Sequence, residues 1–227
     1  MSKASGENRL ADDVLELKER VGKILVLLEK EHPDAKITLE FNNPLELLVA
    51  TILAAQCTDV KVNQITRSLF KKYRTPEDYA KANSVMLEEE IRPTGFFKAK
   101  ANHVKNACRM LVDQYGSQVP KTMDDLIKLP GVARKTANIV LSNAYGITEG
   151  IAVDTHVLRL VKRLGLTQSK TREKIEAGLM HIVPKTSWQR FSDLLIFHGR
   201  KVCMAKKPKC GQCVLNDLCP SAFTFTS

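Results

Sequence analysis

The sequence of 227 residues combines an ordinary apolar content with a strong excess of positive charge. Hydrophobic residues make up 44%, and 35 Lys and Arg against 25 Asp and Glu leave a formal net charge of +10. This composition excludes intrinsic disorder over most of the chain. No run of about eighteen apolar residues and no N-terminal apolar stretch indicates a membrane span or a signal peptide, so we expect a soluble intracellular protein. The charge favours a polyanionic partner, nucleic acid before an anionic membrane surface, with a purely solubilising charge as the alternative.

Apolar residues recur at helical intervals over nearly the whole chain, and no convincing strand alternation occurs. An amphipathic helix is expected at 11–30, Pro44 opens a buried helix at 44–55, and Thr58 or Asp59 can cap a third that continues to about residue 73. The remaining expected helices begin at Thr75-Pro76 and Asn83-Ser84 or cover 98–115, 122–129, 134–145, 154–164, 171–183 and 187–202. We predict an all-α fold of about ten helices, in one large domain or two small ones.

Six cysteines are distributed unevenly. Cys57 and Cys108 stand alone in apolar helical patterns and are expected to be small core residues. The other four lie close together: Cys203, Cys210, Cys213 and Cys219. Four thiolates can surround one tetrahedral zinc ion or one cubane iron–sulfur cluster. Zinc sites usually use two pairs of closely spaced ligands, whereas only one such pair, Cys210 and Cys213, occurs here. The spacing of the four cysteines also differs from that of bacterial ferredoxins. An iron–sulfur cluster is therefore favoured over zinc and over four unliganded thiols.

A tight turn is expected between two helices at 129–137, where Pro130 and Gly131 precede Val132-Ala133-Arg134. The amide groups that begin the following helix have no partners within it, and they lie at the positive end of the helix dipole. Such amides can hold a DNA phosphate, and the contact would not depend on base sequence. The alternative is an ordinary connection between two helices.

Several segments occur in an order that is specific to one protein family. They are LPGVARKTA at 129–137, IAVDTHV at 151–157, AAQCTD at 54–59, HGR at 198–200 and the spacing of the last four cysteines. Together they resemble the endonuclease III family, the helix–hairpin–helix DNA glycosylases of base excision repair, over about residues 15–220. The family pattern has Gly where this chain has Ala133, which restricts the backbone of the turn but keeps the amide N–H that would bind phosphate.

The resemblance implies catalytic roles for Lys135 and Asp154. The family lysine that matches Lys135 attacks C1′ of a damaged nucleotide as a neutral amine, the base leaves, and the resulting Schiff base permits β-elimination of the 3′ phosphate. The helix N-terminus, Arg134 and desolvation by bound DNA are expected to lower the pKa of Lys135. Asp154 matches the catalytic carboxylate, which would stabilise positive charge on the sugar or assist proton transfer; it is also a good helix N-cap, and the roles are compatible.

Further residues are expected to contact DNA once the damaged nucleotide has left the stack. In the family, the Gln that matches Gln56 enters the vacancy, and an apolar residue at the position of Phe96 wedges the opposite strand. That residue is usually Leu, so Phe96 departs from the pattern, and either Phe96 or Phe97 is expected to lie in the core instead. The hairpin residues assigned to phosphate binding are Gly131, Ala133 and Arg134.

The segment between Asp193 and Asp217 contains no acidic residue but several basic ones: Arg200, Lys201, Lys206, Lys207 and Lys209. Lys206 and Lys207 fall between the first two clustered cysteines. A cluster that holds this loop in place would present positive potential to phosphates, so both lysines are expected to bind DNA. The alternative is a loop that is merely solvated.

By resemblance, the architecture is two helical lobes with a DNA cleft between them. Residues 37–148 would form a six-helix barrel that carries Lys135, and residues 1–36 with 149–227 would form a second domain that carries Asp154 and a [4Fe-4S] cluster. The implied protein is a monomeric, bifunctional glycosylase and AP lyase. It would remove oxidised pyrimidines from double-stranded DNA, cleave abasic sites, bind no membrane, and work in the bacterial cytoplasm in association with the nucleoid.

Two alternatives remain open from the sequence. A mismatch-specific or monofunctional glycosylase of the same superfamily is the nearer one. The adenine-mismatch enzymes, however, lack the nucleophilic lysine and carry an additional C-terminal recognition domain, whereas this sequence has Lys135 and continues for only a short segment after Cys219. The other alternative is a non-catalytic helix–hairpin–helix module that binds DNA and holds a structural metal.

Overall fold

The computed structural model describes residues 4–225, with side chains from residue 14 onward. Within this range all of its regular secondary structure is helical. The α-helices are α1 (Ala4–Glu31), α2 (Pro44–Leu53), α3 (Asp59–Lys72), α4 (Pro76–Lys81), α5 (Ser84–Ile91), α6 (Phe97–Gln114), α7 (Met123–Leu126), α8 (Arg134–Tyr145), α9 (Thr155–Arg163), α10 (Arg172–Ile182) and α11 (Trp188–Lys201). Four short 3₁₀ segments are η1 (Arg92–Thr94), η2 (Lys185–Ser187), η3 (Cys210–Gln212) and η4 (Asn216–Leu218). The predicted all-α class is confirmed. Over the described residues, no helix is both long and apolar enough to span a membrane.

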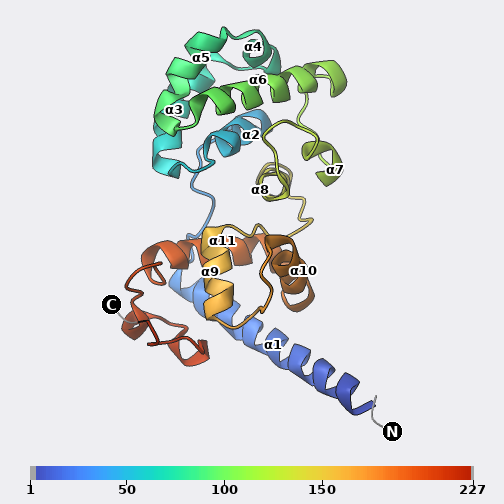
Figure 1. Ribbon diagram of the computed structural model, residues 1–227, viewed down its shortest axis with the longest axis vertical. Helices are drawn as coiled ribbons and strands as arrows, with labels where there is room; N and C mark the ends of the chain where they lie inside the picture. The colour runs from blue at the N-terminus through green and yellow to red at the C-terminus, as the bar shows by residue number, and fades with distance from the viewer. Residues whose placement is uncertain (1–3, 226–227) are drawn as a thin grey trace. The chain divides into compact units, whose positions relative to one another are not determined.

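The chain divides into two compact units. The central unit is Ile37–Glu149 and contains α2 to α8, and the terminal unit joins Met1–Lys36 to Gly150–Ser227. Each unit has its own apolar core, so the chain is organised around two cores. Figure 1 shows α1 beside α9, α10 and α11 in one unit and the helices from α2 to α8 in the other.

The central unit is built around α2, whose side chains are buried on nearly every face. Asn43 caps this helix by accepting from the amide of Glu46, and Pro44 occupies its first turn, where a missing N–H costs nothing. Helix α2 packs against α3, α6 and α8, and α6 also packs against α4 and α5. Cys108 lies in this core, where burial raises the pKa of its thiol to about 12, and Cys57 packs against the same core. Cys108 is a core residue, as predicted, whereas Cys57 is only partly buried at the edge of the core.

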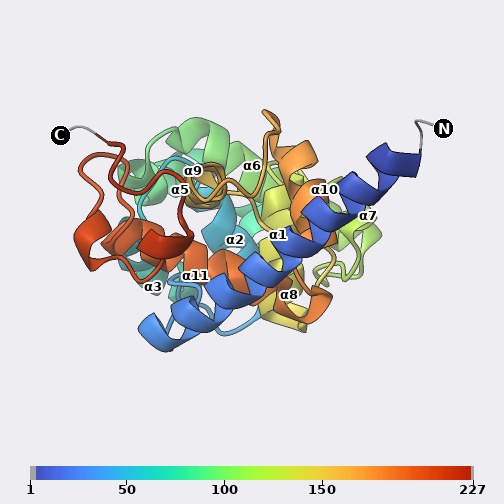
Figure 2. The ribbon, with the colours of Figure 1, turned by 90° about the horizontal axis from the view of Figure 1, so that it is seen from below.

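The terminal unit is held together by α11, which packs against both α9 and α1. Figure 2 shows α1 running across this unit close to α10 and α11. Val21, Ile24 and Leu28 recur at helical intervals on α1 and are fully buried against residues such as Phe191. Most of its remaining surface is polar, but Leu15 and Val26 are 58% and 70% exposed, so the buried stripe places the helix without covering all of its apolar residues.

The helix boundaries agree with the sequence to within one residue except at three places. Helix α2 ends at Leu53, two residues before the expected end at residue 55, because Ala54 caps it. Helix α1 begins at Ala4, earlier than the predicted residue 11. Residues 4–10 are mostly polar and show no apolar period, so no helical pattern could be recognised there. Helix α7 stops at Leu126, although the sequence predicted a helix to residue 129. The chain instead tightens into successive turns, in which the amide of Lys128 donates to Asp125 and the amide of Leu129 donates to Leu126. This early end leaves room for the turn before α8.

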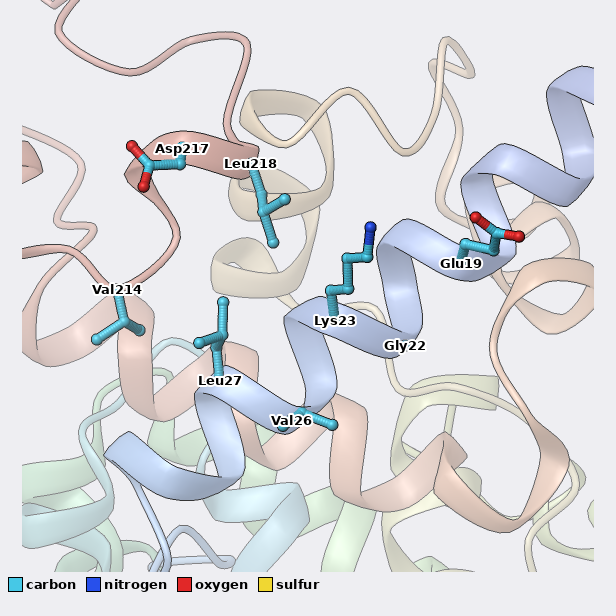
Figure 3. Close-up of a pocket in the computed structure, with 8 residues that line it drawn as sticks. All are labelled: Glu19, Gly22, Lys23, Val26, Leu27, Val214, Asp217 and Leu218. Carbon is cyan, nitrogen blue, oxygen red and sulfur yellow. The ribbon is translucent and has the colours of Figure 1, made fainter.

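A groove lies on the terminal unit between α1 and the segment around η4 (Figure 3). Its lining is mostly apolar and includes three charged residues, Glu19, Lys23 and Asp217. The other lining residues are Gly22, Val26, Leu27, Val214 and Leu218. Leu27, Val214 and Leu218 also pack against the core of the unit. None of the residues that the sequence assigns to chemistry or DNA binding lines this groove.

Candidate functional site

The turn before α8 requires glycine at position 131 for two independent reasons. Gly131 has a φ of +80°, which side chains of L-residues rarely adopt. A Cβ added there would also lie 2.8 Å from Cβ of His103, which is closer than such atoms approach one another. The turn is closed by a 3.0 Å hydrogen bond from the amide of Val132 to the carbonyl oxygen of Leu129. The turn therefore packs closely against His103 of helix α6, and this contact fixes where α8 begins.

Helix α8 begins without a side-chain cap. Its N-cap residue Ala133 has φ −93° and ψ 168°, an extended conformation open to any residue, so the Ala that replaces the family Gly introduces no strain. Because the alanine side chain has no acceptor, the first amides of the helix donate no hydrogen bond to an N-cap side chain. The start of α8 therefore presents N–H donors and the positive end of the helix dipole.

Lys135 lies in the first turn of α8 and is exposed, as is Arg134. The opposite side of the helix is anchored in the core through Ala137, Val140 and Leu141, each fully buried. The side chain of Lys135 is therefore carried by a fixed backbone while remaining accessible. An exposed amine on a rigid helix start is able to reach a molecule that binds at the amides beside it.

Asp154 is the N-cap of α9, as the sequence predicted. Its Oδ1 accepts from the amides of His156 and Val157 at 2.8 Å each. Its Oδ2 lies 3.1 Å from Nδ1 of His156, and the side chain of Asp154 is only 13% exposed. The carboxylate is thus held in one orientation by the helix it caps, while part of it remains open to solvent. It belongs to the terminal unit, and Lys135 belongs to the central unit.

Gln56 and Phe96 share a rare backbone conformation. Their φ values are +53° and +48°, in the left-handed region where non-glycine residues are strained. Both side chains are exposed, Phe96 to 67%. Phe97 instead packs against the core of the central unit and lies under the guanidinium of Arg92. The structure thus separates the two phenylalanines that the sequence left undecided: Phe97 contributes to the core, and Phe96 points outward.

Four half-buried cysteines line one cavity of the terminal unit: Cys203, Cys210, Cys213 and Cys219. Two side chains bring nitrogen atoms to their sulfurs: Arg163 Nη1 donates to Sγ of Cys203 at 3.3 Å, and Nε2 of His198 lies 3.2 Å from Sγ of Cys213. Burial raises the pKa of Cys213 and Cys219, whereas cationic and N–H groups favour thiolates. A shared cavity with donors at the sulfurs fits a thiolate-bound cluster. In the described part of the chain, no three His, Cys, Asp or Glu side chains form a site for a single metal ion.

The loop between Cys203 and Cys210 is fastened by arginines that the sequence analysis did not single out. Arg159 donates to the carbonyl oxygens of Gly199 and Cys203, and Arg163 donates to those of Met204 and Ala205. These contacts join α9 to residues about forty positions later, so no local sequence signal could reveal them. The beginning of the loop is thereby fixed by arginine hydrogen bonds.

Lys206 and Lys207 lie on this fastened loop, and both are exposed. Lys207 has a φ of +50°, in the left-handed region. The positive charge of the loop is therefore held on a defined backbone.

Comparisons with known proteins match both the region that contains the hairpin and the region that contains the four cysteines. The HhH-GPD superfamily of base excision DNA repair proteins matches residues 49–185, and the iron–sulfur binding domain of endonuclease III matches residues 203–219. Endonuclease III of Synechocystis sp. is 49% identical over 205 residues, 90% of this chain and 94% of that protein. Solved structures of a non-covalent endonuclease III–DNA complex and of a trapped endonuclease III–DNA covalent intermediate are each 44% identical, with a TM-score of 0.88, covering 91% of this chain and 97% of theirs.

The cysteine cavity leads to a prediction about metal content. The purified protein should be brown and carry about four iron atoms per chain. Cys213→Ser should lose most of the iron and the visible absorbance, because one thiolate ligand is replaced by a hydroxyl. Cys57→Ser is the matched control and should keep both, since Cys57 lies in the other unit. Iron analysis and absorption spectra check this, and a colourless zinc protein would contradict it.

Proposed function

Because the chain belongs to the endonuclease III family, whose members are DNA glycosylases and AP lyases of base excision repair, we propose that Lys135 is the nucleophile of its reaction. The observation that carries this proposal is the position of Lys135 in the uncapped first turn of α8, beside amides able to hold a DNA phosphate. The covalent endonuclease III–DNA intermediate solved for a relative supports the same chemistry. The enzyme cleaves the glycosidic bond and then the abasic site.

In the proposed reaction the amine of Lys135 acts as the nucleophile and then forms the Schiff base. As a neutral amine it attacks C1′, the bond from C1′ to the base breaks, and the base leaves with the electron pair of that bond and takes up a proton. Loss of a proton from the nitrogen and opening of the sugar give a Schiff base. Removal of a proton from C2′ then allows the bond from C3′ to the phosphate oxygen to break, and hydrolysis of the Schiff base frees the lysine.

Asp154 supplies a fixed negative charge for this reaction. A carboxylate stabilises the positive charge that develops on the sugar as the base departs. The two amide hydrogen bonds at 2.8 Å hold Asp154 in place before substrate arrives, so its orientation costs nothing at the moment of reaction.

DNA binding is assigned to three features of the central unit. The hairpin residues Gly131, Ala133 and Arg134 hold a phosphate, mainly through backbone amides, so that contact does not depend on sequence. Gln56 fills the space left by the displaced nucleotide, and Phe96 wedges the opposite strand. Phe96 stacks on the orphaned base more strongly than leucine would, since an aromatic ring gains about 1–3 kcal/mol per stacked base. The exposure of both side chains supports this assignment.

The remaining assignments concern the cluster and the substrate. The cofactor is a [4Fe-4S] cluster, and its proposed ligands are the cysteines of the matched iron–sulfur domain: Cys203, Cys210, Cys213 and Cys219. These cysteines would hold the cluster, and the loop between Cys203 and Cys210 would then be tied at both ends, so that Lys206 and Lys207 would contact DNA phosphates. The proposed substrates are oxidised pyrimidines and abasic sites in double-stranded DNA. We further propose that the protein works as a monomer in the cytoplasm, at the nucleoid.

The covalent step is tested by borohydride reduction during incubation with DNA that contains an oxidised pyrimidine. The wild-type protein should form a stable adduct, and Lys135→Gln should form none, because an amide cannot produce a Schiff base. Lys128→Gln is the matched control: this lysine precedes the same turn and pairs with Asp125, so its loss should leave the adduct intact. If no damaged or abasic duplex yields an adduct with the wild-type protein, the lyase assignment is wrong.

Asp154→Asn separates the charge of Asp154 from its role as a cap. Asparagine caps helices about as well as aspartate, so the free energy of unfolding should change by no more than about 0.5 kcal/mol. Base release should slow by about 10²–10³-fold, because the charge that stabilises the sugar is lost. Asp154→Ala should lose the same activity and about 1 kcal/mol of stability as well. Single-turnover rates and denaturant unfolding check this, and a wild-type rate for Asp154→Asn would remove the electrostatic role.

The basic loop is tested by the salt dependence of duplex binding. Replacing Lys206 and Lys207 with Glu should weaken binding and lower the slope of log Kd against log salt concentration by about two, since each lost phosphate contact contributes about 0.9. Lys71→Glu with Lys81→Glu makes the same change in net charge at exposed positions of the central unit and should alter the slope less. Fluorescence anisotropy at several salt concentrations measures both, and equal slopes for the two double variants would exclude the loop from the interface.

A further inference from the structure

Lys100 is a lysine buried inside the central unit. Its relative exposure is 3%, although lysine is almost never fully buried unless its charge is paired. Burial lowers the pKa of this amine, and no carboxylate is bonded to it in the described hydrogen bonds, which go to backbone oxygens instead. Burying an amine without a carboxylate partner costs folding free energy, so we expect Lys100 to have a function that explains its position.

The contacts of Lys100 join two loops. Its Nζ donates to the carbonyl oxygen of Leu53 and to that of Thr94, both at 2.8 Å. Its backbone amide donates to the carbonyl oxygen of Phe96 at 3.0 Å. Leu53 is the last residue of α2, just before Gln56, and Thr94 is the last residue of η1, just before Phe96. One residue therefore bonds to the base of the Gln56 loop and to the base of the Phe96 loop.

Both loops contain strain that needs support. Gln56 and Phe96 have positive φ values, and such conformations persist only where surrounding contacts hold them. The loop bases are rigid and buried: Leu53 is 0% and Thr94 is 2% exposed, and the hydroxyl of Thr94 donates to Ile91. The side chains at the loop tips are exposed, as insertion into DNA requires. The Lys100 amine is the hydrogen-bonded connection between the two bases.

We propose that Lys100 is a positioning residue that fixes the spacing between the Gln56 loop and the Phe96 loop, so that both side chains enter a duplex with one displaced nucleotide at the same time. The inference rests on the proposed function, in which Gln56 and Phe96 insert into DNA. Loops held at the correct spacing before binding avoid the cost of ordering during binding. Contacts with phosphates need no insertion, so binding to intact duplex should depend little on Lys100.

The test compares Kd for a duplex that contains a tetrahydrofuran abasic analogue with Kd for the same duplex undamaged. Lys100→Met keeps the apolar stem and removes the donors. It should lower the preference for the abasic analogue by about tenfold, the equivalent of one hydrogen bond from a charged group. Lys105→Met is the matched control, because Lys105 lies on the same helix and also donates twice, to Ala82 and Ser84. Its preference should stay within about twofold of wild type.

A double-mutant cycle shows whether the effect passes through the loops. In a protein that already carries Gln56→Ala and Phe96→Ala, Lys100→Met should cause no further loss of preference, since nothing remains to be positioned. The same loss in both backgrounds would overturn the inference, because a merely structural lysine would act independently of the two side chains. Should Lys100→Met fail to fold, as judged by thermal unfolding and iron content, Lys100→Gln retains one donor group and should show an intermediate preference.

The outcome also distinguishes this inference from the proposed function. A wild-type protein without preference for the abasic analogue would overturn the insertion on which the inference rests, and the inference with it. A wild-type preference that Lys100→Met leaves unchanged would overturn only the role of Lys100. A tenfold loss in Lys100→Met that disappears in the Gln56→Ala and Phe96→Ala background would support it.

Discussion

The close approach of Gly131 to His103 is the constraint on which the start of α8, and with it the proposed active site of the central unit, depends. A side chain at position 131 would meet the ring of His103 and would also have to adopt a left-handed backbone, so the turn closes in one way. That turn decides where α8 starts, and the start of α8 decides where its uncapped amides and Lys135 lie. The proposed phosphate binding and the proposed nucleophilic attack would therefore both depend on a single piece of backbone geometry, with the rest of α8 anchored in the core.

Left-handed backbone recurs at the other places that the proposal assigns to DNA. Gln56, Phe96 and Lys207 are three of the non-glycine residues with positive φ in the described part of the chain. Each lies on a loop whose base is held by a long cationic side chain that donates to backbone oxygens. Lys100 holds the loops of Gln56 and Phe96, and Arg163 holds the loop of Lys207. Strain of this kind needs support from its surroundings, and buried or half-buried cations provide it without adding side chains to the exposed surface.

Local signals account for what the sequence predicted. Helix α8 has the predicted bounds, because a turn precedes it and Gly146 in a left-handed conformation ends it. Thr58 and Asp154 were recognised as caps because a short polar side chain precedes each apolar helix. The family resemblance found in residues 54–59, 129–137, 151–157 and 198–219 is confirmed by matches that span most of the chain.

What the sequence did not reveal depends on contacts between distant residues. Nothing near Lys100 in the sequence indicates that its amine reaches the end of α2, forty-seven positions earlier. The contact of His198 with Cys213 and the arginine bonds to the cysteine loop are of the same kind. Positive φ at Gln56 and Phe96 also had no signal, since neither residue favours that conformation. The position of Phe96 rather than Phe97 at the surface likewise follows from tertiary packing.

The central claim is that the amine at the start of α8 forms the covalent bond to DNA, and peptide mapping of the reduced adduct tests it most directly. The wild-type protein is reduced with borohydride during reaction, the DNA is digested to a sugar remnant, and the modified residue is located by mass spectrometry. The account predicts the remnant on Lys135. A remnant on another lysine or on the N-terminal amine, with Lys135 unmodified, would contradict it.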